Sequence, residues 1–117
     1  MDEFNRDPNY SHLLNALIEK TKAGKLSWEE TADEFAFLAA VGGRQTFEIA
    51  HRKVRDPLTG ELTRLPVLTV RGEDGRLLFE TSGTPSEAAT ELYALARRAA
   101  RNEDVRVKES LELIQNL

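Results

Sequence analysis

Basic side chains are the residues of this sequence best suited to binding chemistry. Arg97, Arg98 and Arg101 share one face of a predicted helix, and Arg106 and Lys108 follow just beyond it. Guanidinium groups recognise carboxylates and phosphates through paired hydrogen bonds. We therefore predict an interaction surface here, for an acidic protein partner or a nucleic-acid backbone.

A second basic run lies in the middle of the chain, in and beside the strand predicted over 46–54. Its members are Arg44, Arg52, Lys53 and Arg55. If the two runs met in space, together they could hold a phosphate backbone or an acidic partner. The alternative is a solvated helix face, because Glu87 and Glu91 near the start of the helix and arginines near its end suit the helix macrodipole.

Catalytic and metal-binding chemistry has few residues to draw on. The chain has no cysteine and two histidines, and neither histidine has a metal-ligand spacing. We predict that His51 is a plain surface residue on a solvated strand face. No glycine-rich phosphate loop is present, and the paired carboxylates fall in predicted turns or caps. We expect no enzyme, metal or cofactor. The remaining enzymatic alternative is a small hydrolase or transferase built on carboxylates, with His51 as general base.

Composition narrows the function classes further. The net charge of −4 argues against non-specific DNA binding, which needs a strong positive field. No run approaches the 18 apolar residues of a membrane span, so we expect no membrane partner. The lack of cysteine fits a reducing cytoplasm.

The length of 117 residues suits one domain. We expect a flexible tail over residues 1–10 and a single α+β domain over residues 11–117. A helix is predicted from a Ser11 cap to a Gly24 stop. A second helix follows Thr84-Pro85-Ser86-Glu87, with Thr84 as its cap and Asn102 at its end. A last short helix then carries Val107, Leu111 and Ile114.

Residues 26–41 fit either a helix opened by a capping box at Ser27 or a strand. We favour the strand because Phe35, Phe37, Ala39 and Val41 alternate up to Gly42-Gly43, a pair suited to a two-residue hairpin turn. Further strands are predicted over 46–54, 62–70 and 76–82, and Pro66 marks an edge or a bulge. The predicted fold is α+β: an N-terminal helix, an antiparallel meander of four to five strands, and two C-terminal helices packed on one face of the sheet.

Trp28 is the only tryptophan. We interpret it as a core anchor, with an interface hot spot as the alternative. Phe35, Phe37, Phe47 and Phe79 are expected in the core.

Two segments carry a family resemblance. The run Thr21-Lys22-Ala23-Gly24-Lys25-Leu26-Ser27-Trp28-Glu29-Glu30-Thr31 and the run Leu92-Tyr93-Ala94-Leu95-Ala96-Arg97-Arg98 resemble small, uncharacterised bacterial proteins with a helix, a GKLxW stretch, a β-meander and a closing helix. The resemblance covers about residues 11–102. It implies strand over 35–41 and a bacterial cytoplasmic origin, and it implies no activity.

The function that these observations favour is a non-enzymatic protein-interaction module, an adaptor or regulatory subunit, whose partner could be a second copy in a homodimer. The alternative is a nucleic-acid-associated protein that uses the arginine-rich helix face.

Overall fold

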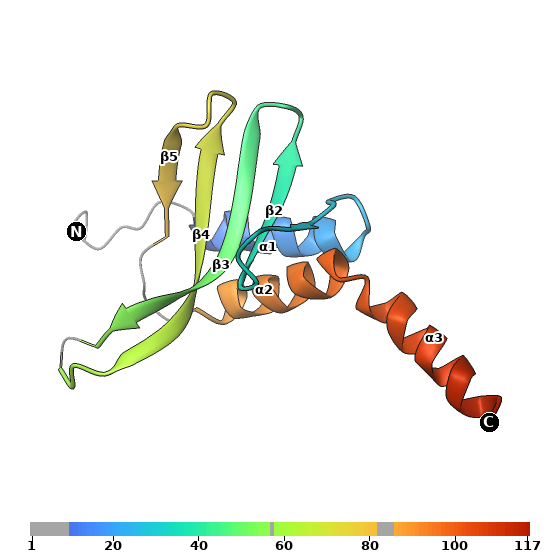
Figure 1. The fold of residues 1–117 in the computed structure, drawn as a ribbon. Coiled ribbons are helices and arrows are strands. Elements are labelled where there is room, and N and C mark those ends of the chain that lie inside the picture. The colour runs from blue at the N-terminus through green and yellow to red at the C-terminus, as the bar shows by residue number, and fades with distance from the viewer. Residues whose placement is uncertain (1–9, 57, 82–85) are drawn as a thin grey trace.

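The fold is described from a computed structural model, which describes residues 10–56, 58–81 and 86–117. The elements in chain order are α1 (Tyr10–Lys22), β1 (Glu29–Glu30), β2 (Ala36–Val41), β3 (Gln45–Arg55), β4 (Leu62–Gly72), β5 (Leu77–Glu80), α2 (Glu87–Ala100) and α3 (Glu103–Gln115). Consecutive strands pair antiparallel in the order β1-β2-β3-β4-β5 (Figure 1). This confirms the predicted α+β fold, with its N-terminal helix, antiparallel meander and two C-terminal helices.

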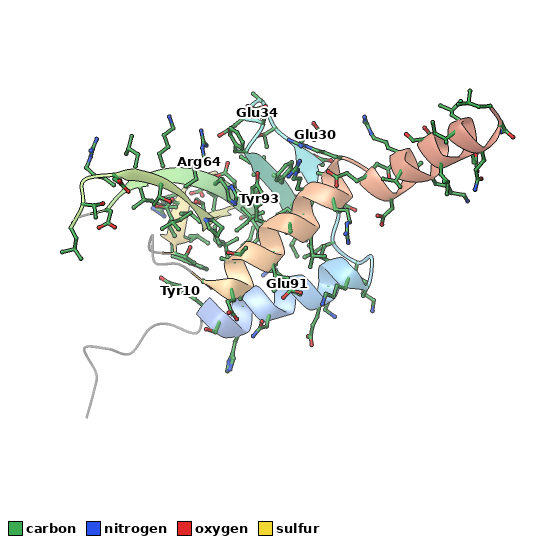
Figure 2. The ribbon with its side chains drawn as sticks, turned by 90° about the horizontal axis from the view of Figure 1, so that it is seen from below. Tyr10, Glu30, Glu34, Arg64, Glu91 and Tyr93 are labelled. Atoms are coloured by element: carbon green, nitrogen blue, oxygen red, sulfur yellow. The ribbon has the colours of Figure 1, made fainter. Side chains whose placement is uncertain are left out.

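One face of the sheet, called here the inner face, carries the core. Phe37 on β2, Ile49 on β3 and Leu68 on β4 pair side by side in the register and are almost fully buried. α2 lies across this face and α1 packs along α2 (Figure 2). Leu92 at the centre of α2 is fully buried, so the apolar stripe of this helix closes the core.

The hairpin of β3 and β4 is the longest feature of the sheet and reaches past the N-terminal end of α2 (Figure 1). Along β4, β5 pairs only with Thr69 to Arg71. Among the described residues, Pro66 therefore pairs only with His51 of β3. Proline fits this position, because no described strand takes a hydrogen bond from its missing N–H; the prediction had allowed an edge or a bulge.

Residues 36–41 form a strand, as predicted. The turn that follows differs by one residue from the expected two-residue turn: Val41 pairs with Gln45, so Arg44 also belongs to the connection. Gly42 and Gly43 have φ values of +61° and +67°, and the Arg44 N–H donates to the Val41 carbonyl. Two successive left-handed residues explain the glycine pair.

Two helix starts differ from the predictions. α1 begins at Tyr10, so the expected tail and the Ser11 cap are wrong at this residue; residues 1–9 lie outside the described part. The N-cap of α2 is Ser86, whose hydroxyl accepts a hydrogen bond from the Ala89 N–H. Two hydroxyl residues compete for this cap in the sequence, and the one nearer the helix holds it. Thr84 and Pro85 lie outside the described residues.

α3 adjoins the layer of helices through α2 alone. Asn102, with a φ of +54°, ends α2 with a left-handed residue and turns the chain away from the sheet. α3 contacts no other element and none of its residues is buried, so it projects from one end of the fold (Figure 1). Among the residues that the structure describes, no helix combines the length and the apolar character needed to cross a bilayer.

Candidate interaction surfaces

The three predicted arginines of α2 are each held by a neighbour. Arg97 Nε lies 3.6 Å from Glu103 Oε2, and Arg98 Nε lies 3.8 Å from Asp104 Oδ1. Arg101 donates to the Glu34 carbonyl at 2.9 Å, and its guanidinium lies 5.5 Å from the centre of the Phe37 ring. Two of these contacts link α2 to α3, and the contact of Arg101 links the end of α2 to the loop before β2.

The predicted basic run over residues 44–55 does not form one patch. Arg44 lies in the β2–β3 turn, and Arg52 follows about 26 Å further along β3 at the usual rise of a strand. Arg52 lies on the outer face and pairs with Glu48 at 2.6 Å, whereas Lys53 continues the inner face of Ile49. Arg106 lies on α3. Of the predicted residues, Arg97 lines a hollow together with His51, and Lys53 lies two residues further along the same face of β3.

His51 lies on the inner face and is half-buried, so its prediction as a residue of a solvated strand face is wrong. Its ring stacks on Tyr93 of α2, with centroids 3.6 Å apart and planes 12° apart. Burial lowers the pKa of His51 from 6.5, and the positive charges of Arg64 and Arg97 lower it further. The imidazole is therefore held in a positively charged environment.

Arg64 is the residue that our sequence reasoning missed. It is exposed on β4, directly opposite Lys53, and its guanidinium lies 4.2 Å from the centre of the Phe35 ring. Figure 2 shows Arg64 next to Tyr93. The signal that could have found it is the register of the β3–β4 hairpin. We call His51, Lys53, Arg64, Tyr93 and Arg97 the basic–aromatic cluster.

Tyr93 lies at the centre of this cluster and is 7% exposed. Its ring meets Phe37 edge-on at 5.6 Å. Burial raises the pKa of Tyr93; Asp33 adds to this effect, and the three arginines 97, 101 and 64 oppose it. The phenol is thus surrounded by more positive than negative groups.

A hollow of about 460 Å³ opens beside the cluster. Its charged and aromatic lining residues are His51, Glu91, Tyr93, Arg97, Arg98 and Glu103. No group of three metal-ligating side chains gathers anywhere in the described part of the chain.

Trp28 lies in the core. It is 5% exposed, and its Nε1–H donates to Thr21 Oγ1 at 2.9 Å. The Thr21 hydroxyl in turn donates to the Leu17 carbonyl. This burial favours the core anchor over the alternative of an interface hot spot.

α3 presents an apolar stripe to solvent. Val107, Leu111 and Ile114 lie within about 60° of one another around the helix axis. Their exposed fractions are 66%, 53% and 66%. We call these three residues the α3 stripe.

A shallow groove of about 300 Å³ lies where α1, α2 and the start of α3 meet. Its floor includes Leu95 and Ala99, and Lys22 and Arg98 line it as well. Asp104 lines the groove too and pairs with Arg98, while Lys22 pairs with Glu91, so the groove combines apolar side chains with two basic ones that are each in an exposed ion pair.

No known protein family, curated protein or solved structure matches this chain. The function of the basic–aromatic cluster and of the α3 stripe is therefore inferred from the chemistry of their residues.

Proposed function

We propose that this protein is a non-enzymatic protein-interaction module that self-associates, and that α3 is the element by which one copy contacts another. The observation that carries the proposal is the exposure of the whole of α3. None of its residues is buried, although it bears the apolar α3 stripe. Contiguous exposed apolar surface of this kind marks a site of protein association.

The length of α3 supports the same conclusion. Helices shorter than about 12–15 residues are marginal in water on their own, and stability normally comes from packing an apolar face. α3 has 13 residues, and among the described elements it contacts only α2. A second surface over the stripe would supply the missing packing.

The occupant that fits is a second copy of this chain. α3 carries four acidic and two basic side chains, so it is net acidic. The groove between α1, α2 and α3 offers Leu95 and Ala99 with Lys22 and Arg98 beside them. An acidic amphipathic helix suits this groove if Lys22 and Arg98 exchange their exposed pairs with Glu91 and Asp104 for acidic residues of the partner's α3. A two-fold axis would use both contacts twice.

The area of the contact also favours use of the groove. Two helices of about 20 Å laid side by side bury several hundred Å² in total, below the roughly 1,200 Å² of a stable interface. Two symmetric contacts between α3 and the groove add to that area. The proposed dimer therefore includes both the pairing of the α3 helices and their docking on the partner's groove.

The compartment and origin belong to the same proposal. We place the protein in a bacterial cytoplasm as an adaptor or regulatory subunit. The absence of cysteine and the resemblance to small bacterial proteins support this setting.

The experiment uses the lack of cysteine. Ser110, beside the stripe, is changed to Cys in the full chain and given a nitroxide label. Because the natural chain has no cysteine, each copy then carries one label at this single thiol. Double electron–electron resonance should then give one narrow distance between two labels. Absence of any dipolar modulation at micromolar concentration would show a monomer and overturn the proposal.

A further inference from the structure

Like charges face each other on the exposed part of the β3–β4 hairpin. Lys53 and Arg64 are directly opposite partners in the register, on the inner face. His51 is the diagonal neighbour of Arg64 on the same face. Directly opposed like charges destabilise a strand pair. This part of the hairpin therefore holds a charge arrangement that an anion between the side chains would relieve.

The guanidinium group of Arg64 is fixed without using its hydrogen-bond donors. It lies over the Phe35 ring, a contact made by the face of the group, whereas its five N–H donors lie in its plane. Neither Lys53 nor Arg64 takes part in an ion pair with another described residue. The donors of both side chains thus remain available to a ligand.

α2 adds a third source of positive charge. Arg97 lies close enough to His51 and Tyr93 to act on both through its charge, and it lines the hollow beside them. The stack of His51 on Tyr93 fixes the position of the imidazole relative to α2. Basic groups from β3, β4 and α2 therefore surround one region.

The nearby acidic groups are already engaged. Glu103 pairs with Arg97, and Glu91 pairs with Lys22 at 3.0 Å. Asp33 Oδ1 accepts the Phe35 N–H, which shapes the loop before β2. Their charges weaken the positive field without occupying the donors of Lys53 and Arg64.

We propose that His51, Lys53, Arg64 and Arg97 form a binding site for a phosphate group, beside the His51–Tyr93 stack. A phosphate carries close to two negative charges at neutral pH and three acceptor oxygens, which match a guanidinium fork and an ammonium group together. A carboxylate would satisfy a single guanidinium and leave the opposed charge of Lys53 in place. This proposal does not rest on self-association, and the one residue of α3 beside the site is Glu103, which pairs with Arg97.

The test is a titration of the full chain with inorganic phosphate at constant ionic strength, followed by calorimetry and by the NMR signals of the His51 ring. Saturable binding with a Kd below about 10 mM is expected, and the His51 signals should shift with it. Arg64→Gln should weaken phosphate binding about tenfold or more, because hydrogen bonds to charged groups are the strong ones.

The matched control is Arg52→Gln, which removes the same charge one residue from Lys53 but on the outer face. It should change the Kd less than about twofold, since it alters only the distant field. Lys53→Gln provides a second variant that leaves the stack of Arg64 on Phe35 intact, in case Arg64→Gln unfolds the hairpin. Equal weakening by Arg52→Gln and Arg64→Gln, or no saturable binding to the wild type, would overturn the proposal.

A second titration with a nucleoside monophosphate identifies the source of the phosphate group. Tighter binding than inorganic phosphate would support the site and show that a base stacks on the His51–Tyr93 pair. Equal affinity would support the site as one for the phosphate group alone. If inorganic phosphate did not compete with the nucleotide for binding, the proposed phosphate site would be contradicted.

Discussion

The α3 stripe gives the sharpest prediction. We expect Leu111→Gln with Ile114→Gln to convert the dimer into a monomer. The two side chains are 53% and 66% exposed, so about half to two-thirds of each remains to be buried by a partner. Full burial of such a side chain is worth about 1.5–3 kcal/mol, which leaves about 1 kcal/mol or more for each.

A symmetric dimer loses these side chains from both copies. Four side chains at about 1 kcal/mol each amount to about 4 kcal/mol, which raises the dimer Kd by about a thousandfold. Gln has nearly the helix propensity of Leu and adds no charge, so α3 itself should persist in circular dichroism. The unfolding free energy of the monomer should change by less than about 0.5 kcal/mol, since the side chains pack on nothing within the chain.

The assay is sedimentation equilibrium over a range of concentrations, with a matched control. Val105→Gln with Leu113→Gln removes two exposed apolar side chains of the same helix that lie off the stripe. The control should shift the Kd less than about threefold. If both pairs of changes weaken the dimer equally, the stripe is not the contact surface. An unchanged dimer in the stripe variant would refute the reasoning altogether.

Three further predictions concern stability. Burial and nearby arginines lower the pKa of His51, so the unfolded state takes up a proton more readily, and stability should be retained above about pH 6.5 and fall as the pH drops below it. Thermal melts at about pH 7.5 and about pH 5.5 measure this fall, which His51→Gln should lack and His12→Gln should keep. Gly42→Val should destabilise by about 1–2 kcal/mol more than Gly42→Asn in urea unfolding, because the φ of +61° is left-handed and a Cβ meets nothing within 4 Å; equal losses would contradict the role of φ. Trp28→Phe should cost about 1–3 kcal/mol through the lost hydrogen bond to Thr21 and the smaller ring, and a neutral change would show that the indole is not a core anchor.

Local signals were sufficient to predict most of the fold. The glycine pair at 42–43 requires left-handed backbone, and the alternation before it requires a strand, so the hairpin followed from neighbouring residues. Short connections then left antiparallel pairing of successive strands as the simplest arrangement. The predicted cap of α2 was wrong by two residues, because Thr84 and Ser86 both have a hydroxyl group that could cap the start of the helix.

The candidate sites depend on contacts that local patterns do not specify. His51 was predicted on a solvated face although the alternation of Phe47 and Ile49 continues to it, and its stacking on Tyr93 depends on where α2 crosses the sheet. Arg64 faces Lys53 only because of the hairpin register over 11 residues of each strand. The position of α3 follows from the single left-handed residue Asn102, which amino-acid type alone does not fix.

The most direct test of the central claim is the molar mass of the wild-type chain by light scattering on a sizing column, in low and in high salt, with absorbance at 260 and 280 nm. Self-association through an apolar stripe predicts twice the 13.2 kDa of one chain in both salts, with the absorbance ratio of protein. A mass of one chain at every concentration would contradict the account. Co-eluting 260 nm absorbance that disappears in high salt would instead favour nucleic-acid binding.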